Sequence, residues 1–340
     1  MRAPVAVNGY GTIGKRVAEA IRQMPDLELK GIVKYTPDYS VLVAYKQGIP
    51  IYVPEGKEGV FEEVGVKPSG TIDELFGSVS LVVDASPGGK GAQNKRVYVE
   101  RGLSALFEGG ESPDVAEVSF STLCNYRQAL GKKYIRVVSC NTTALLRLIC
   151  LLDRRVGVRK VRAVIVRRAS DPKEDKGIVN TVKLDPPSIP SHHAIDVKTV
   201  LPGLDIETVA LIVPTTLMHV HVVHVQTKRS TSIDEVVEAL SSTPRVVVLE
   251  GAKIGIDSTS KIVEFARDLG RKRYDIYENV VWRDMIKVSG DELTIVQAVH
   301  QEAIVIPENI DAIRAALRLA ESAEETMKVT DKVLNVGLQL

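Results

Sequence analysis

The amino-acid sequence predicts an α/β protein of two domains, a doubly wound parallel sheet followed by an α+β domain with a mostly antiparallel sheet. Three observations lead to this fold class. A glycine-rich turn joins the first apolar segment to an amphipathic helix, strands and helices alternate up to residue 139, and long β-rich segments dominate from residue 161 onward. A chain of 340 residues is also long enough to form two domains with large cores.

The glycine-rich turn reads Gly9-Tyr10-Gly11-Thr12-Ile13-Gly14 and directly follows an apolar strand, residues 4–8. The first glycine permits a tight turn, the second lets a pyrophosphate approach the backbone, and the third allows close helix–sheet packing. A second strand at residues 29–34 supplies the expected context. Residues 1–139 are therefore predicted to form a Rossmann NAD(P)-binding domain, with cofactor contacts from Gly9, Gly11, Thr12, Ile13 and Gly14.

The end of the second predicted strand bears on which dinucleotide binds. An acidic residue there would bind a ribose 2′-hydroxyl and repel a 2′-phosphate. The chain instead has Lys34, then Tyr35 and Thr36, and no acid until Asp38. We therefore expect NADP to be accepted in preference to NAD, with contacts from Lys34 and Thr36. The alternative is that Lys34 is an ordinary solvated charge.

Three further apolar strands, residues 81–84, 105–107 and 134–138, continue the predicted parallel sheet. Turns of small residues follow the first two, and ligands of doubly wound folds bind at this carboxyl edge. Each turn is also compatible with simple loop chemistry. The expected cofactor contacts from these turns are Ser86, Pro87 and Gly110.

Cys140 lies where the strand at residues 134–138 gives way to an apolar helix. Unpaired N–H groups and the dipole at a helix start favour a thiolate, and the same groups can stabilise an oxyanion after attack on a carbonyl. A free cysteine without such context is usually a small buried apolar residue. Next to a dinucleotide-binding domain, Cys140 is predicted to be a catalytic nucleophile.

Residues 140–306 are predicted to form the catalytic domain, in which two capped helices interrupt the strands. Residues 307–334 then predict one long helix, with Pro307 near its start. The β-rich segments of the catalytic domain are residues 161–167, 208–213, 219–227, 245–249 and 293–300.

Three histidines, His219, His221 and His224, lie on one predicted strand. His219 is at the junction of loop and strand, and we expect it to be the base that pairs with Cys140, because imidazole titrates near neutral pH. His221 and His224 are interpreted as packing residues. A zinc site on alternate strand positions is the alternative, but no Cys or carboxylate lies nearby in the sequence, so no metal is predicted.

Arg167 and Arg168 leave a strand as a pair. Paired arginines suit phosphate binding because a guanidinium donates two hydrogen bonds to an oxyanion, whereas a structural ion pair is the competing interpretation. His192 and His193 lie in a predicted loop, where substrate contact and simple surface exposure are both possible.

The composition predicts a cytoplasmic enzyme. Net charge is +1, and no apolar segment reaches about 18 residues, so neither nucleic acid nor a membrane is an expected partner. Scarce Asn and Gln, with plentiful Arg, Lys and Glu, favour a thermophilic protein. Cys124 and Cys150 are then either reduced core thiols or a disulfide, because hyperthermophiles retain intracellular disulfides.

Seven motifs occur in an order that closely resembles the archaeal type of phosphorylating glyceraldehyde-3-phosphate dehydrogenase, over essentially the whole chain. The chain differs from the bacterial and eukaryotic branch of this family in two ways. Lys34 stands where that branch has an acidic residue, and His219 lies further from the nucleophile in the sequence. The motifs are Asn8-Gly9-Tyr10-Gly11-Thr12-Ile13-Gly14, Ser139-Cys140-Asn141-Thr142-Thr143, Arg167-Arg168-x-x-Asp171-Pro172, Pro190-Ser191-His192-His193, Pro214-Thr215-Thr216-x-Met218-His219-Val220-His221, Val299-His300-Gln301-Glu302 and Pro307-Glu308-Asn309-Ile310-Asp311.

The resemblance implies that Cys140 attacks the aldehyde of D-glyceraldehyde 3-phosphate and that His219 takes the hydroxyl proton. Hydride then passes to NADP or NAD, and inorganic phosphate releases 1,3-bisphosphoglycerate. It also implies a homotetramer and a C-terminal helix that completes the nucleotide domain. Implied cofactor contacts are Arg168 and Gln301, and implied substrate or phosphate contacts are Ser139, Asn141, Thr142, Arg167, His192, His193 and Thr215.

Three other functions are compatible with parts of this pattern. A semialdehyde dehydrogenase, such as aspartate-semialdehyde dehydrogenase, shares the combination of cysteine and dinucleotide domain. A non-phosphorylating aldehyde dehydrogenase would release the free acid and need no phosphate. A dinucleotide-sensing protein would have lost catalysis, which the retained Cys140 and His219 argue against.

Overall fold

The computed structural model describes residues 2–171, 174 and 177–338. The chain divides into two compact units. The first comprises Met1–Val138 and Ile306–Leu334, and the second comprises Ser139–Val305 and Asn335–Leu340. No helix among the described residues is long and apolar enough to cross a membrane.

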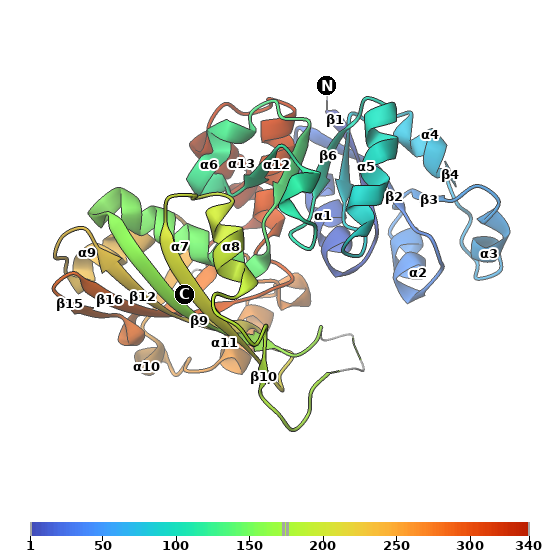
Figure 1. The fold of residues 1–340 in the computed structure, drawn as a ribbon. Helices are drawn as coiled ribbons and strands as arrows, with labels where there is room; N and C mark the ends of the chain where they lie inside the picture. The colour runs from blue at the N-terminus through green and yellow to red at the C-terminus, as the bar shows by residue number, and fades with distance from the viewer. Residues whose placement is uncertain (1, 172–173, 175–176, 339–340) are drawn as a thin grey trace. The chain divides into compact units, whose positions relative to one another are not determined.

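The first unit contains an eight-stranded sheet in the order β4-β3-β2-β1-β5-β6-β8-β7, and each pairing between its described strands is parallel (Figure 1). The strand order reverses at β1, and this switch point opens a crevice at the carboxyl ends of doubly wound sheets. The strands are β1 (Ala3–Asn8), β2 (Leu27–Val33), β3 (Ile51–Val53), β4 (Gly70–Thr71), β5 (Leu81–Asp84), β6 (Ser104–Phe107), β7 (Val118–Phe120) and β8 (Tyr134–Val137).

Helices flank this sheet because its central strands are apolar on both faces, with β5 buried along its whole length. An aromatic and aliphatic cluster that includes Phe76, Tyr98 and Phe107 fills one side. The helices of the unit are α1 (Thr12–Gln23), α2 (Tyr39–Lys46), α3 (Glu58–Glu62), α4 (Ile72–Phe76), α5 (Lys90–Glu100), η1 (Pro113–Val115), α6 (Thr122–Ala129), α12 (Ile306–Ala316) and α13 (Ala323–Leu334).

The single C-terminal helix expected from the sequence is two helices, so that prediction is wrong. Arg318 has a positive φ of 51°, and the N–H of Leu319 donates to the carbonyl of Arg314 at 2.8 Å, which closes α12. Ser322 then caps the start of α13 by accepting from the N–H of Glu325 at 3.2 Å. The spacing of Ser322 and Glu325 is a capping signature that could have predicted the break.

The two C-terminal helices pack against α1 and α6 and so complete the first unit. Arg314 on α12 donates two hydrogen bonds to Asp26, at 2.8 and 2.9 Å, and a third to Thr330 on α13 at 2.6 Å. Glu308 accepts from the N–H of Thr122 at 2.7 Å, at the start of α6. This buried network ties the last part of the chain to the first.

The second unit contains an eight-stranded sheet in the order β10-β11-β9-β12-β16-β14-β13, with β15 paired to β16. Only the β9–β11 and β13–β14 pairings between described strands are parallel, which confirms the predicted mostly antiparallel sheet. The strands are β9 (Val158–Arg168), β10 (Lys183–Leu184), β11 (Asp205–Val213), β12 (His219–Thr227), β13 (Val246–Leu249), β14 (Asn279–Trp282), β15 (Lys287–Ser289) and β16 (Glu292–Val299).

The central helix of this unit is α7 (Cys140–Val156), which contacts β9, β12 and β16 (Figure 1). Ser139 is its N-cap, and Gly157, with a φ of 72°, ends it. Most of its side chains are buried, so the start of α7 is held rigidly against the sheet. The other helices are α8 (His192–Lys198), α9 (Ile233–Leu240), α10 (Gly251–Ile254), α11 (Thr259–Asp268), η2 (Lys272–Tyr274) and η3 (Arg283–Met285).

Candidate active site

The predicted dinucleotide turn has the geometry that a pyrophosphate requires. Gly9 has a φ of +99°, and a Cβ added there would lie 2.7 Å from the carbonyl oxygen of Ala85. A Cβ on Gly14 would lie 1.9 Å from the carbonyl oxygen of Gly9, so this close approach of helix and turn also requires glycine. A Cβ on Gly11, in contrast, would meet no described atom within 4 Å, so that position faces open space.

The start of α1 is available to an anion. Gly11 is its N-cap, no described side chain caps it, and its first turn holds no acidic residue. The start of α5 is different, because Glu111 accepts from the N–H groups of Gly91 and Ala92 at 3.0 and 3.3 Å. Of these two helix starts, only that of α1 thus lacks a capping side chain among the described residues, as a phosphate site requires.

Lys34 is not a free surface charge. Its Nζ donates to Asp38 Oδ2 at 2.6 Å and to Ser40 Oγ at 3.2 Å, and its side chain is 13% exposed. Burial acts to raise the pKa of Asp38, but hydrogen bonds from Lys34 and Ser40 outweigh it and lower that pKa. Thr36 is exposed beside this pair. Asp38, the first acidic residue after β2, is thus paired with Lys34, the residue predicted to contact the ribose 2′-phosphate.

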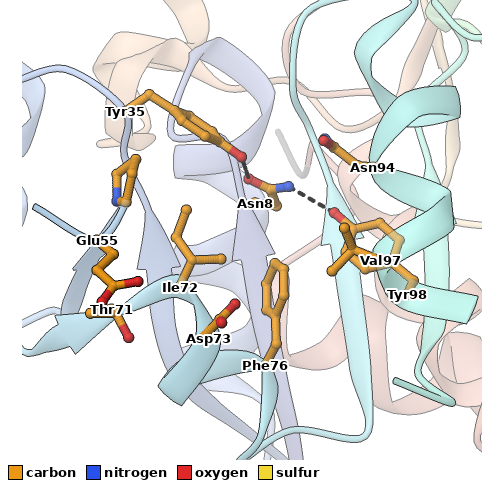
Figure 2. Close-up of a pocket in the computed structure, with 11 residues that line it drawn as sticks. Asn8, Tyr35, Glu55, Thr71, Ile72, Asp73, Phe76, Asn94, Val97 and Tyr98 are labelled. Atoms are coloured by element: carbon orange, nitrogen blue, oxygen red, sulfur yellow. Dashed lines mark hydrogen bonds between the residues drawn. The ribbon is translucent and has the colours of Figure 1, made fainter. Parts of the chain in front are cut away.

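A cavity of about 290 Å³ opens at the carboxyl ends of β1 and β2 (Figure 2). Tyr35 donates to Asn8 Oδ1 at 3.2 Å, Asn8 donates to the Tyr98 hydroxyl at 2.7 Å, and Tyr98 donates to Asp84 at 2.7 Å. This cavity was not predicted, because α4 and α5, which are distant in the sequence from β1 and β2, contribute much of its wall. Its lining residues include Asn8, Tyr35, Ile72, Phe76, Val97 and Tyr98.

The turns after β5 and β6 lie side by side, with a Cβ on Gly88 only 3.2 Å from the carbonyl oxygen of Gly110. Pro87 and Gly110 are exposed there, and the Ser86 hydroxyl is bound to Asp84. Glu108, which was not predicted, has one buried carboxyl oxygen without a hydrogen-bond partner among the described residues. Burial raises the pKa of Glu108 to about 8, opposed by Asn309 and assisted by Asp84.

In the second unit, Cys140 is the first residue of α7 and a free thiol, whereas Cys124 and Cys150 are disulfide-bonded. Burial raises the pKa of Cys140 to about 11. Arg167, Arg168 and the backbone N–H of Asn141 lower it, and Glu302 raises it further. The thiolate bias expected at a helix start is therefore outweighed by desolvation, and the two arginines are the main opposing charges.

Both predicted arginines are in ion pairs. Arg167 is bound to Asp185, and Arg168, which is 4% exposed, is bound to Asp171 and lies 3.3 Å from Glu302. The Nε atom of each arginine is nevertheless buried without a described hydrogen-bond partner. The carboxylate partners agree with the interpretation of the two arginines as structural ion pairs. Each guanidinium nevertheless retains one N–H donor that these carboxylates do not use.

His219 is fully buried, and its Nδ1 accepts from the backbone N–H of Arg168 at 3.0 Å. The neutral ring must then carry its proton on Nε2. Nε2 has no hydrogen bond of normal geometry to a described residue, although the Gln301 side chain is near enough to raise the pKa of the ring. Burial, followed by the charge of Arg168, lowers the pKa of His219 well below its ordinary value.

Thr215 lies beside the arginine pair, because its carbonyl accepts from the N–H of Ala169 at 2.8 Å. Thr142 and His193 are buried and already bonded within the unit: Thr142 donates to Asp196 at 2.6 Å, and both ring nitrogens of His193 have partners. His192 is exposed and stacks on His193, with ring centroids 3.9 Å apart. Of the predicted phosphate contacts, His192 is thus the histidine with an accessible ring.

The described residues contain no group of three or more His, Cys, Asp or Glu side chains placed to hold a metal ion. A parallel sheet with an uncapped glycine turn, joined in one chain to a free cysteine at a helix start, defines a dehydrogenase that uses a nicotinamide dinucleotide.

Comparisons with known proteins identify the family. The model for the C-terminal domain of glyceraldehyde 3-phosphate dehydrogenase matches residues 139–285. Curated proteins named glyceraldehyde-3-phosphate dehydrogenase are similar over nearly the full length: that of Hyperthermus butylicus is 57% identical and covers 98% of both chains, and that of Archaeoglobus fulgidus is 52% identical and covers 99% of both. The chain belongs to the glyceraldehyde-3-phosphate dehydrogenase family, which confirms the resemblance seen in its motifs.

A solved structure of aspartate semialdehyde dehydrogenase II from Vibrio cholerae is similar with a TM-score of 0.66, covering 94% of this chain and 99% of that one. Its sequence is only 16% identical, so this likeness concerns the fold alone. The relatives at 50% identity or more place the chain with the glyceraldehyde-3-phosphate dehydrogenases rather than with the semialdehyde dehydrogenases, one of the alternatives that the sequence left open.

Proposed function

We propose that the chain oxidises D-glyceraldehyde 3-phosphate and couples the oxidation to phosphorylation, forming 1,3-bisphosphoglycerate through a thioester on Cys140. The observation that carries this proposal is the position of Cys140 at the start of α7, under the charges of Arg167 and Arg168. A covalent acyl intermediate splits one difficult oxidation into two easier steps. The bound nicotinamide dinucleotide would supply the hydride acceptor.

The first unit would hold the dinucleotide by groups that fit its parts. The start of α1, which no described side chain caps, suits the pyrophosphate, and the space in front of Gly11 admits it. The cavity beside Tyr35 suits a flat adenine ring. Lys34 and Thr36 would meet a 2′-phosphate in competition with Asp38, and we propose that NADP is preferred to NAD.

The chemical step begins when Cys140 gives up its proton to water and its thiolate attacks the aldehyde carbon. The carbonyl electron pair moves to oxygen, and the resulting alkoxide accepts hydrogen bonds from His219 Nε2–H and from N–H groups at the start of α7. When hydride leaves, the carbonyl reforms as a thioester. Inorganic phosphate then attacks that carbonyl and releases the Cys140 thiolate.

This scheme changes the role proposed for His219. A base needs a free lone pair, but the lone pair on Nδ1 is engaged by the N–H of Arg168, and Nε2 carries the proton. A thiolate attack yields an alkoxide directly, so hydride transfer needs a hydrogen-bond donor rather than a base. His219 therefore serves as a neutral donor.

Two anions need donors in this reaction, the substrate phosphate and the attacking phosphate. Arg167 and Arg168 each have a spare Nε–H, and His192 and Thr215 add an accessible ring and a hydroxyl. Ser139 and Asn141 flank the nucleophile on either side. We assign these groups to the substrate and phosphate together, and we also assign Gln301 and Arg168 to the cofactor.

The chain is also proposed to assemble as a homotetramer. Large aliphatic side chains protrude from the segment between β9 and β11, with Val179 86%, Ile189 67% and Ile195 60% exposed. Isolated exposed apolar residues are ordinary, but a series of them on one segment favours burial against another copy. Light scattering after size-exclusion chromatography would give the mass of four chains, and the mass of one chain would refute the proposal.

The decisive assay is reduction of NADP, and then of NAD, by D-glyceraldehyde 3-phosphate with and without phosphate or arsenate. Sustained turnover that requires either anion would support the acyl-phosphate mechanism. Equal turnover without them would show that water takes the acyl group. Cys140→Ser should abolish oxidation while leaving dinucleotide affinity within about threefold, because the thiol contributes chemistry rather than cofactor binding.

A further inference from the structure

Beneath the nucleophile, seven buried polar side chains form one continuous series of hydrogen bonds within the second unit. Each is at most 1% exposed. They come from four strands and from α7 and α8, including its N-cap, so the series crosses the whole unit. In order they are Asn279, Gln297, His221, Asn141, His193, Ser191 and Thr208.

The direction of this series is fixed at its first end by a backbone carbonyl. Asn279 Nδ2 donates to the carbonyl of Ala144 at 2.8 Å and to Gln297 Oε1 at 2.7 Å. Gln297 must then present its NH₂ group to His221 Nδ1, 3.2 Å away. His221 accepts on Nδ1 and so carries its proton on Nε2, which donates to Asn141 Oδ1 at 2.9 Å.

The other half of the series follows from the same rule. Asn141 Nδ2 donates to His193 Nε2 at 3.1 Å, so His193 carries its proton on Nδ1 and donates to Ser191 Oγ at 3.2 Å. Ser191 donates to Thr208 at 2.7 Å, and Thr208 completes the series at the carbonyl of Ser191. Every group has one permitted orientation because the series starts and ends at an acceptor that cannot donate.

We infer that His221 is a positioning residue for Cys140, acting through the side chain of Asn141, which it holds in a single orientation. Asn141 is the residue after the nucleophile, and its backbone N–H is one of the groups that favour the Cys140 thiolate. Burial lowers the pKa of His221 to about 3 and that of His193 to about 2, so both rings remain neutral, as the series requires. The inference rests on the proposed function only for the identity of the nucleophile.

The test measures the rate at which iodoacetamide alkylates Cys140 in the full chain, followed by mass spectrometry as a function of pH. His221→Phe removes both hydrogen bonds while keeping a ring, and should lower the rate at pH 7 by about tenfold by raising the pKa of the thiol. His221→Gln can accept from Gln297 and donate to Asn141, so it should restore the rate to within about twofold. His224→Phe, on the exposed face of the same strand, is the matched control and should alkylate like the unaltered chain.

A His221→Phe chain that alkylates with the unaltered rate and pH profile would overturn the inference. If the His221→Phe variant fails to fold, the positions of the histidine protons in the unaltered chain test the inference instead. Long-range ¹⁵N–¹H spectra of histidine-labelled protein should show the proton of His221 on Nε2 and that of His193 on Nδ1. A proton on Nδ1 of His221 would overturn the inference. Neither readout involves turnover, so a failure to oxidise D-glyceraldehyde 3-phosphate would count against the proposed function alone.

Discussion

The backbone N–H of Arg168 donates to Nδ1 of His219 at 3.0 Å, so the buried imidazole beside the arginine pair presents an N–H rather than a lone pair. His219→Gln retains a donor at the same distance from the backbone and should keep kcat within about tenfold. His219→Ala removes it and should lower kcat by about a hundredfold, the typical loss of an oxyanion donor. Equal losses in both variants would restore the role of base.

The Lys34–Asp38 ion pair predicts opposite effects of two substitutions on cofactor choice. Lys34→Asp should shift kcat/KM from NADP toward NAD, because it places two acids near the ribose. Asp38→Asn should favour NADP further, because it releases Lys34 from its carboxylate partner. Steady-state kinetics with both dinucleotides gives the ratio, and Lys30→Ala, which breaks a different surface pair, is the control. If the ratio of kcat/KM for NADP to kcat/KM for NAD is unchanged in both variants, residues other than Lys34 and Asp38 determine recognition of the 2′-phosphate.

Two glycines of the dinucleotide turn, Gly14 and Gly11, should respond differently to substitution by alanine. Gly14→Ala should fail to fold, because its Cβ would lie 1.9 Å from a backbone oxygen. Gly11→Ala has open space around it, so the chain should keep its Tm within a few degrees. Its methyl group would still occupy the approach of the pyrophosphate and weaken dinucleotide binding about tenfold or more. Calorimetry separates the two effects, and full affinity in Gly11→Ala would contradict this placement.

Glu108 makes the stability of the first unit depend on pH. Its pKa rises from 4.5 to about 8 on folding, so the folded state holds the proton more tightly than the unfolded chain. The resulting stability is complete below about pH 4.5 and is lost as the pH rises through about 8. Thermal melts should show a fall in Tm between about pH 5 and 8 that Glu108→Gln reduces. An identical slope in the variant would assign the pH dependence to other groups.

The three cysteines should differ in reactivity. Cys124 and Cys150 are each in the disulfide form, and Cys140 is free. Titration with a thiol reagent in denaturant should therefore give one thiol without reductant and three after reduction. Three thiols before reduction would exclude the bond.

The sequence predicted the parts of the molecule whose signals are local. The glycine turn, the strand at residues 219–227 and the helix that begins at Cys140 lie where they were expected. The second C-terminal helix was not predicted, although the spacing of Ser322 and Glu325 is a capping signature for its start. The hydrogen bonds of His221 could not be predicted, for a different reason. It is buried, as a packing residue would be, but its partners Asn141 and Gln297 are 80 and 76 residues away, and no local pattern reports such bonds.

The ties between Arg314 and Asp26 have a consequence for biosynthesis. The first unit is interrupted in the sequence by Ser139–Val305 of the second unit, because it resumes only at Ile306. A ribosome therefore synthesises most of the second unit before it makes α12 and α13, which the first unit needs. Until α12 and α13 have been made, the carboxylate of Asp26 and the apolar faces of α1 and α6 stay uncovered in the nascent chain.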